Sequence, residues 1–175
     1  MPTKLRAPEQ LVTERLILRK HTMDDLPAFT SFVVDKEATR FLLFPEDKKT
    51  PEGACWMLEM AIANYETDVP HMSIAITGRD SGAFLGSCGL SGLGENSFEV
   101  YYAVLPAHQG KGIASEAMRA LVDYSFRTLG IDELVAFVSP ENEPSVRVAE
   151  KLGFARGELA EHMGRVGWQY SLKRV

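Results

Sequence analysis

The residues whose types and spacing are most able to do chemistry lie between Val104 and Met118. A β-rich run ends at Val104, and Gly110 and Gly112 follow it with Lys111 between them. An amphipathic helix is predicted to begin directly after the second glycine. Small residues at a helix start leave backbone N–H groups open at the positive end of the helix dipole. The turn therefore predicts an anion site, and we expect the anion to be a cofactor pyrophosphate.

This glycine turn has other interpretations. An isolated G-x-G is more often a tight turn without a ligand. A dinucleotide-binding site needs G-x-G-x-x-G early in a βαβ unit, but Ser115 stands in place of the third glycine, and the turn follows several predicted strands. The P-loop string G-x-x-x-x-G-K-[ST] is absent from the sequence. Both nucleotide-binding classes are therefore disfavoured.

The elements around the turn are predicted to form a mixed α/β domain. Hydrophobic periodicity, helix caps and turn residues give the order β α α β β β α β α β β. The predicted strands are 16–21, 72–77, 83–90, 98–104, 134–138, 154–161 and 168–173, and the predicted helices start near residues 22, 50, 112 and 142. Residues 1–175 are expected to be one domain, with residues 1–10 as a loose N-terminal arm. Alternation along 98–104 places Glu99 and Tyr102 on opposite faces of their strand.

Composition narrows the class of protein further. The 175 residues are 45% hydrophobic and 25% charged, so neither disorder nor a fibre is indicated. The net charge of −5 argues against a nucleic-acid binder, and no apolar run is long enough to predict a membrane span. Cys55 and Cys88 form no zinc pattern or disulfide framework, so we expect reduced thiols, no metal and a cytoplasmic location.

Three segments together resemble the GNAT superfamily of acyl-CoA N-acyltransferases. Residues 108–114 match its signature Q/R-x-x-G-x-G/A, and residues 142–154 match a second block, N-x-x-S-x-x-x-x-E-K-x-G-F. Residues 13–19 look like the start of the branch that acetylates ribosomal-protein alanine. The segments follow one another in the order and spacing of that family.

The resemblance implies a splayed, mostly antiparallel sheet of six to seven strands with helices on both faces. It also implies acetyl-CoA as cosubstrate, whose pantetheine arm pairs with the main chain of Tyr102 and Val104. The N–H groups expected to hold the pyrophosphate belong to Gln109, Gly110, Lys111, Gly112, Ile113, Ala114 and Ser115. Lys111 is either a counter-charge or simply solvated.

The resemblance also suggests catalytic roles. An ammonium must lose a proton before it can attack a thioester, and we expect Glu99 to be the base, directly or through a water; the alternative is a surface glutamate. An N–H near Val104 would serve the oxyanion. The tyrosine acid of many relatives is replaced by Ala149. Ser145 is the expected substitute, and helix capping is its alternative role. Asn142 is expected to cap the same helix and to contact the cofactor.

The predicted reaction is N-acetylation by direct attack of a primary amine. The expected acceptor is a protein N-terminal amine or a small amine or amino acid, and the protein is expected to be a monomer or a homodimer. Aromatic residues at Phe41, Phe44, Trp56 and Tyr65 belong either to the core or to an acceptor pocket. Two other functions stay open: a non-catalytic acyl-CoA-binding regulatory module and a nucleotide-binding oxidoreductase.

Overall fold

The computed structural model describes residues 3–175, which form one eight-stranded sheet and four α-helices. The strands are β1 (Gln10–Val12), β2 (Leu16–Lys20), β3 (His71–Gly78), β4 (Phe84–Gly94), β5 (Ser97–Val104), β6 (Glu133–Val138), β7 (Ala155–His162) and β8 (Arg165–Lys173). The helices are α1 (Leu26–Val34), α2 (Pro51–Asn64), α3 (Ile113–Arg127) and α4 (Glu143–Lys151), with 3₁₀ turns at Met23–Asp25, Glu46–Lys48 and Pro106–His108. Each predicted strand and helix is present, and β1 is additional.

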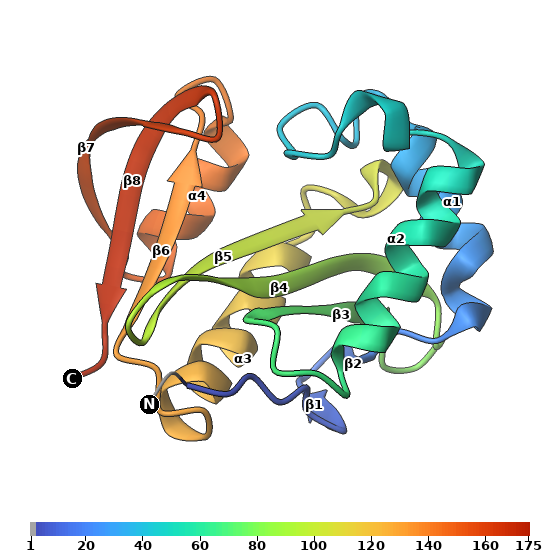
Figure 1. Cartoon of the computed structure of the whole chain (residues 1–175), viewed down its shortest axis with the longest axis horizontal. Helices are drawn as coiled ribbons and strands as arrows, with labels where there is room; N and C mark the ends of the chain where they lie inside the picture. Colours follow the sequence, from blue (N-terminus) through green and yellow to red (C-terminus); the bar gives the residue numbers. More distant parts are fainter. Residues whose placement is uncertain (1–2) are drawn as a thin grey trace.

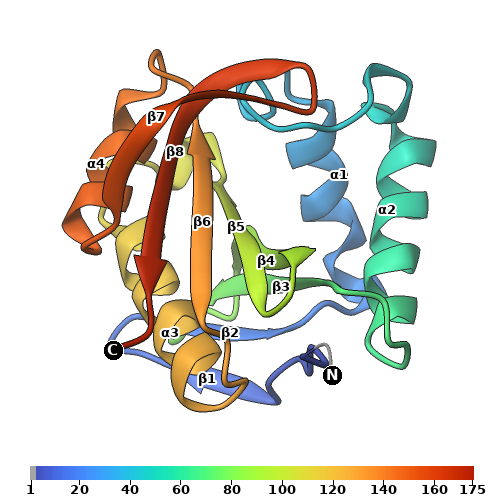
Figure 2. The ribbon, with the colours of Figure 1, turned by 60° about the vertical axis from the view of Figure 1, so that its left-hand side comes forward.

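The sheet runs in the order β1-β2-β3-β4-β5-β6-β8-β7 and is antiparallel except where β5 meets β6. Helices α1 and α2 cover one face, and α3 and α4 cover the other (Figure 2). The predicted mixed α/β architecture with helices on both faces is therefore confirmed. The sheet has eight strands, not the expected six to seven, because Gln10–Val12 pairs with Ile17–Arg19. This added strand, β1, is too short to give a periodic signal in the sequence.

Residues 3–9 form no helix or strand, but they are packed against the domain. Leu5 is buried in the core, and the Tyr124 hydroxyl donates to the Arg6 carbonyl at 2.8 Å. Gln10 already belongs to β1. The prediction of a loose arm is therefore wrong for residues 3–10, because one leucine anchors the segment.

Two apolar clusters hold the helices on the sheet. On one face, α3 buries Met118 and Leu121 against the larger cluster of the sheet. On the other face, Phe32 of α1 and Leu58 of α2 belong to one buried cluster with Phe84 of β4. Each fully buried side chain of this size contributes about 1.5–3 kcal/mol relative to an exposed one. The central strands are thus fixed from both sides.

Strands β5 and β6 pair at one end and then separate (Figure 1). Within residues 3–175, the paired positions are Ser97 to Glu99 with Glu133 to Val135. Beyond them β5 runs on to Val104 and β6 to Val138. The sheet therefore opens into a gap whose edges are strand backbone.

Candidate active site

The main chain of β5 faces this gap at alternate residues. The Leu105 N–H donates to the Leu85 carbonyl of β4 at 2.8 Å. Leu105 therefore faces β4, and Val104, the residue before it, faces away from β4. Alternation gives Tyr102 the same direction. The structure thus places the main-chain groups of both residues at the edge where the pantetheine arm was expected to pair.

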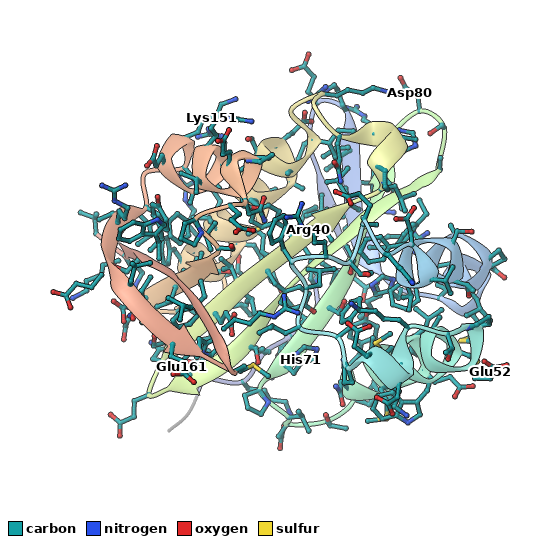
Figure 3. The ribbon with its side chains drawn as sticks, turned by 90° about the horizontal axis from the view of Figure 1, so that it is seen from above. Arg40, Glu52, His71, Asp80, Lys151 and Glu161 are labelled. Carbon is teal, nitrogen blue, oxygen red and sulfur yellow. The ribbon has the colours of Figure 1, made fainter. Side chains whose placement is uncertain are left out.

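A cavity of about 940 Å³ lies where β5 and β6 separate and extends over the face covered by α1 and α2. Its walls come from β5, β6, the start of α4, the segment 40–44, α2 and the β7–β8 hairpin. Figure 3 looks down on this face and shows Arg40 and His71 between the hairpin, where Glu161 lies, and the helices α1 and α2. Among the four aromatic residues noted in the sequence, Phe41, Phe44 and Trp56 line the cavity. Tyr65 instead donates its hydroxyl to the Ser73 carbonyl.

The glycine turn presents open amides at the start of α3. Gly110 and Gly112 have φ values of 74° and 76°, which are left-handed conformations that favour glycine. The first N–H of the helix to bond back is that of Glu116, to the Gly112 carbonyl at 3.1 Å. The amides of residues 113–115 therefore precede the helical ladder, and residues 109–112 are exposed. This geometry fits a diphosphate held by backbone N–H groups.

The backbone N–H of Gln109 does not have the role that was expected for it, which was to hold the pyrophosphate. Its N–H donates to the Pro106 carbonyl at 3.3 Å, and its side-chain amide donates to the Val104 carbonyl at 3.0 Å. The prediction that the Gln109 N–H is one of the open donors is therefore wrong, because the 3₁₀ turn before it takes that N–H. The side chain instead ties the glycine turn to the end of β5 and leaves the Val104 N–H as the group facing the gap.

Arg15, which the sequence reasoning missed, lies beside the glycine turn. Its Nη1 atom is 2.8 Å from the Lys111 carbonyl, and its Nε atom is 2.6 Å from Oε2 of Glu116. Oε1 of Glu116 accepts from the Thr13 hydroxyl at 2.6 Å. Burial raises the pKa of Glu116, but the hydrogen bonds from Thr13 and Arg15 outweigh it and lower the pKa below its ordinary value. The Glu116 carboxylate therefore stays ionised, and the adjacent Arg15 guanidinium balances its charge.

Glu99 lines the cavity and has a partner that the sequence did not indicate. The Nε2 atom of His162 lies 3.0 Å from Oε2 of Glu99. The two side chains are 20% and 18% exposed. The His162 ring stacks on Phe137 of β6, with ring centroids 3.8 Å apart and an interplanar angle of 9°. No local pattern could have found this contact, because the two residues are 63 positions apart.

Ser145 and Asn142 both line the cavity from the start of α4. Asn142 is the N-cap, and its side-chain oxygen accepts the Ser145 N–H at 3.4 Å. The capping role is therefore taken by Asn142, as predicted, and is not an alternative explanation for the Ser145 hydroxyl. Ala149 is buried in the core. Position 149 therefore supplies no proton-donating side chain.

Tyr102 carries a second hydroxyl on the same wall. Its hydroxyl donates to the Ser145 carbonyl at 3.2 Å. Burial raises the pKa of Tyr102 to about 12, so the hydroxyl stays protonated at neutral pH. The sequence reasoning assigned Tyr102 only a main-chain role. The tertiary structure adds a proton-bearing side chain beside Ser145.

Two further findings concern residues 3–175 alone. No three His, Cys, Asp or Glu side chains in this range are grouped so as to hold a metal ion. No helix in the same range is both long and apolar enough to cross a membrane.

The splayed sheet with its cavity and the open amides at the start of α3 fit an acyl-CoA-dependent acyltransferase. Residues 15–155 match the family described as acetyltransferase (GNAT) domain. The chain belongs to this family and is an acetyl-CoA-dependent N-acetyltransferase, which confirms the resemblance noted in the sequence.

Similar proteins agree with this assignment. The chain is 32% identical over 163 residues to the uncharacterized N-acetyltransferase YoaA of Bacillus subtilis, and the aligned region covers 91% of each protein. The acetyltransferase structure from Agrobacterium tumefaciens has a TM-score of 0.78 and 27% identity, covering 97% of this chain and 96% of that one. RimL, a ribosomal L7/L12 alpha-N-protein acetyltransferase in complex with coenzyme A, has a TM-score of 0.81 and 20% identity, covering 95% and 98%.

Proposed function

We propose that the protein transfers an acetyl group from acetyl-CoA to a primary amine by direct attack. The acceptor is a protein N-terminal amine or a small amine or amino acid. The observation that carries the proposal is that Glu99 and Ser145 line one cavity, which opens into the gap beside the main chain of β5. A carboxylate and a hydroxyl that line one cavity are suited to take the ammonium proton and to protonate the leaving thiolate.

Each group of the chain has one task in this scheme. Acetyl-CoA supplies an activated acetyl thioester. Glu99 takes the proton of the acceptor ammonium, directly or through a water, because an amine attacks only when it is neutral. The Val104 N–H faces the gap and stabilises the negative charge that develops on the carbonyl oxygen. Ser145 donates a proton to the departing thiolate and is reprotonated, directly or through a water, by the second proton that the attacking nitrogen loses as the amide forms. Tyr102 is the rival donor.

The cavity wall supports an acceptor with an apolar body. Phe41, Phe44 and Met57 line it. At its mouth, Met163 and Val166 of the β7–β8 hairpin are 69% and 60% exposed. Exposed apolar side chains around a cavity mark a binding surface rather than a core. They favour the N-terminus of a peptide or protein over a small polar amine.

The charges on the cavity wall also favour an acceptor with a single amine on an apolar chain. Glu141 faces Arg40, with a carboxylate-to-guanidinium distance of 3.4 Å. Glu99 faces His162. A polycationic acceptor needs several carboxylates without side-chain partners, and the two lining glutamates are already paired, Glu141 with Arg40 and Glu99 with His162. A single amine attached to an apolar chain fits this wall better.

An acetyl-CoA-dependent screen tests the proposed function. Peptides with a free N-terminus, the same peptides with a blocked N-terminus, single amino acids and spermidine are each incubated with the enzyme. Release of the coenzyme A thiol is measured, and the product is identified by its mass. Thiol release with free but not with blocked peptides supports the proposal. Tight acetyl-CoA binding without amine-dependent release would instead favour the regulatory module.

A further inference from the structure

His162 joins the two halves of the splayed sheet across the cavity. It is the last residue of β7, and β7 is connected to β6 through β8. Glu99 lies on β5, at the last paired position before β5 and β6 separate. The 3.0 Å contact between them therefore spans the point at which the gap opens.

The His162 ring is held in a defined plane. Stacking on Phe137 fixes the ring face, because the two rings are nearly parallel and in van der Waals contact. With its proton on Nε2, the neutral ring donates to Oε2 of Glu99. One carboxylate oxygen is thus occupied by the imidazole, and the second oxygen is left for the acceptor.

We propose that His162 is a positioning residue for Glu99, and this proposal rests on Glu99 being the base of the proposed function. The imidazole holds the carboxylate at the edge of the gap and aims its free oxygen, Oε1, at the acceptor amine. Phe137 acts as the platform that keeps the imidazole in place. The β7–β8 hairpin thereby takes part in proton removal without touching the substrate.

Protonation of His162 changes this arrangement. A doubly protonated ring forms an ion pair with Glu99, and the ion pair makes the carboxylate a weaker base. The other charged or titratable side chains that line the cavity are Arg40, His71, Tyr101, Tyr102, Glu141 and Arg165. On β6 the residue packed against the ring is the uncharged Phe137. Glu99 is the group within hydrogen-bond distance of the imidazole.

Two substitutions separate the hydrogen bond from the packing. His162→Phe keeps an aromatic ring on Phe137 and removes the donor, so kcat should fall about 10- to 100-fold, which is what loss of one hydrogen bond to a charged group costs. His162→Gln keeps an N–H donor and should recover most of that loss. The acid limb of the kcat–pH profile should change shape in both variants. Glu161→Gln, at the exposed neighbouring position, is the control that should keep wild-type kcat.

A double-mutant cycle with Glu99→Gln gives the decisive readout. If His162 acts through Glu99, His162→Phe should cause no further loss of kcat in a Glu99→Gln background. His71→Phe, which changes another histidine of the same cavity, should show losses that multiply with Glu99→Gln. The dissociation constant for acetyl-CoA should stay within about twofold of wild type in every variant. Calorimetric titration measures this constant and also reports on folding.

Three outcomes overturn the proposal. Wild-type kcat in His162→Phe would show that the contact does not serve the reaction, and losses that multiply with Glu99→Gln would show that His162 acts independently. Wild-type kcat in Glu99→Gln would also overturn it, by removing the base through which His162 acts. That last result would leave acetyl transfer itself standing, because thiol release in the amine screen tests the transfer separately.

Discussion

Arg15 and Glu116 meet at the start of α3, where Nε of Arg15 lies 2.6 Å from Oε2 of Glu116. The same guanidinium donates to the Lys111 carbonyl at 2.8 Å. Without this cation, an ionised Glu116 would stand unneutralised in the first turn of the helix whose amides face the proposed pyrophosphate site. The ion pair therefore removes a repulsive charge and also holds the glycine turn.

Replacing Arg15 by methionine should weaken coenzyme A binding about tenfold, a change of about 1.4 kcal/mol. The repulsion is electrostatic, so the loss should shrink as salt is raised. Isothermal titration at two ionic strengths measures both effects. Arg119→Met is the matched control, because Arg119 is exposed on the same helix and should leave the affinity unchanged. An equal loss in both variants would mean that general charge rather than the ion pair sets the affinity.

Gly110→Ala should impair both stability and cofactor binding. An alanine at a φ of 74° is strained, at a cost of about 1–2 kcal/mol. Gly82 has a φ of 69° and, like Gly110, open space around an added Cβ, but it lies in the β3–β4 turn. Both substitutions should lower the thermal midpoint to a similar extent, and only Gly110→Ala should also weaken coenzyme A binding. Equal affinities in the two variants would argue against the glycine turn as the anion site.

Glu99→Gln should lower kcat about 100-fold or more at neutral pH. The defect should become smaller toward pH 9.5, because the acceptor amine then loses its proton without a base. Initial rates of thiol release between pH 6.5 and 9.5 check this. Glu141→Gln, which alters the other lining glutamate, should keep the wild-type shape of the profile. A pH-independent defect in Glu99→Gln would assign the carboxylate to substrate binding instead.

Ser145→Ala and Tyr102→Phe distinguish the two hydroxyls that are proposed as proton donors to the leaving thiolate. If Ser145 is the donor, Ser145→Ala should lower kcat about tenfold at pH 7 and less at pH 9, where a thiolate departs without protonation. Tyr102→Phe should then cost less than about threefold, because it removes only the bond to the Ser145 carbonyl. The reverse order of effects would transfer the role to Tyr102. Since Asn142 caps α4, Ser145→Ala should keep the wild-type thermal midpoint.

Asp25 should make stability depend on pH in the acid range. It is buried, and Arg19 donates to both of its oxygens at 2.8 and 2.9 Å. Burial raises the pKa of Asp25, but the hydrogen bonds, led by that from Arg19, outweigh it and hold the pKa well below its ordinary value. Since the folded-state pKa is the lower one, this stabilisation is complete above the ordinary carboxyl pKa and is lost as the pH falls below it.

Asp25→Asn should therefore cost about 2 kcal/mol of unfolding free energy at pH 7, because it leaves a partly buried guanidinium without its anion. The difference from wild type should shrink between about pH 4 and pH 2. Urea unfolding across that range measures it. Asp24→Asn, at the exposed neighbouring position, should change stability by less than about 0.5 kcal/mol. A difference that stays constant with pH would exclude ionisation as its cause.

The amino-acid sequence alone determined the features that depend on neighbouring residues. The left-handed glycines at positions 110 and 112, the Asn142 cap and the boundaries of α3 are set within a few residues, so pattern and propensity predict them. Alternation likewise predicted that Glu99 and Tyr102 stand on opposite faces of β5. The order and spacing of the segments 13–19, 108–114 and 142–154 predicted the fold, because they resemble one family.

Only the tertiary structure decided which distant residues meet. The separation of β5 from β6 places His162 beside Glu99, 63 residues away, and the pairing of β1 with β2 places Arg15 beside Glu116, 101 residues away. The Gln109 N–H lost its expected role through a 3₁₀ turn that local spacing did not reveal. Side-chain contacts of this kind depend on strand order and on where a ladder ends. Those are properties of the whole sheet, and a stretch of ten residues does not encode them.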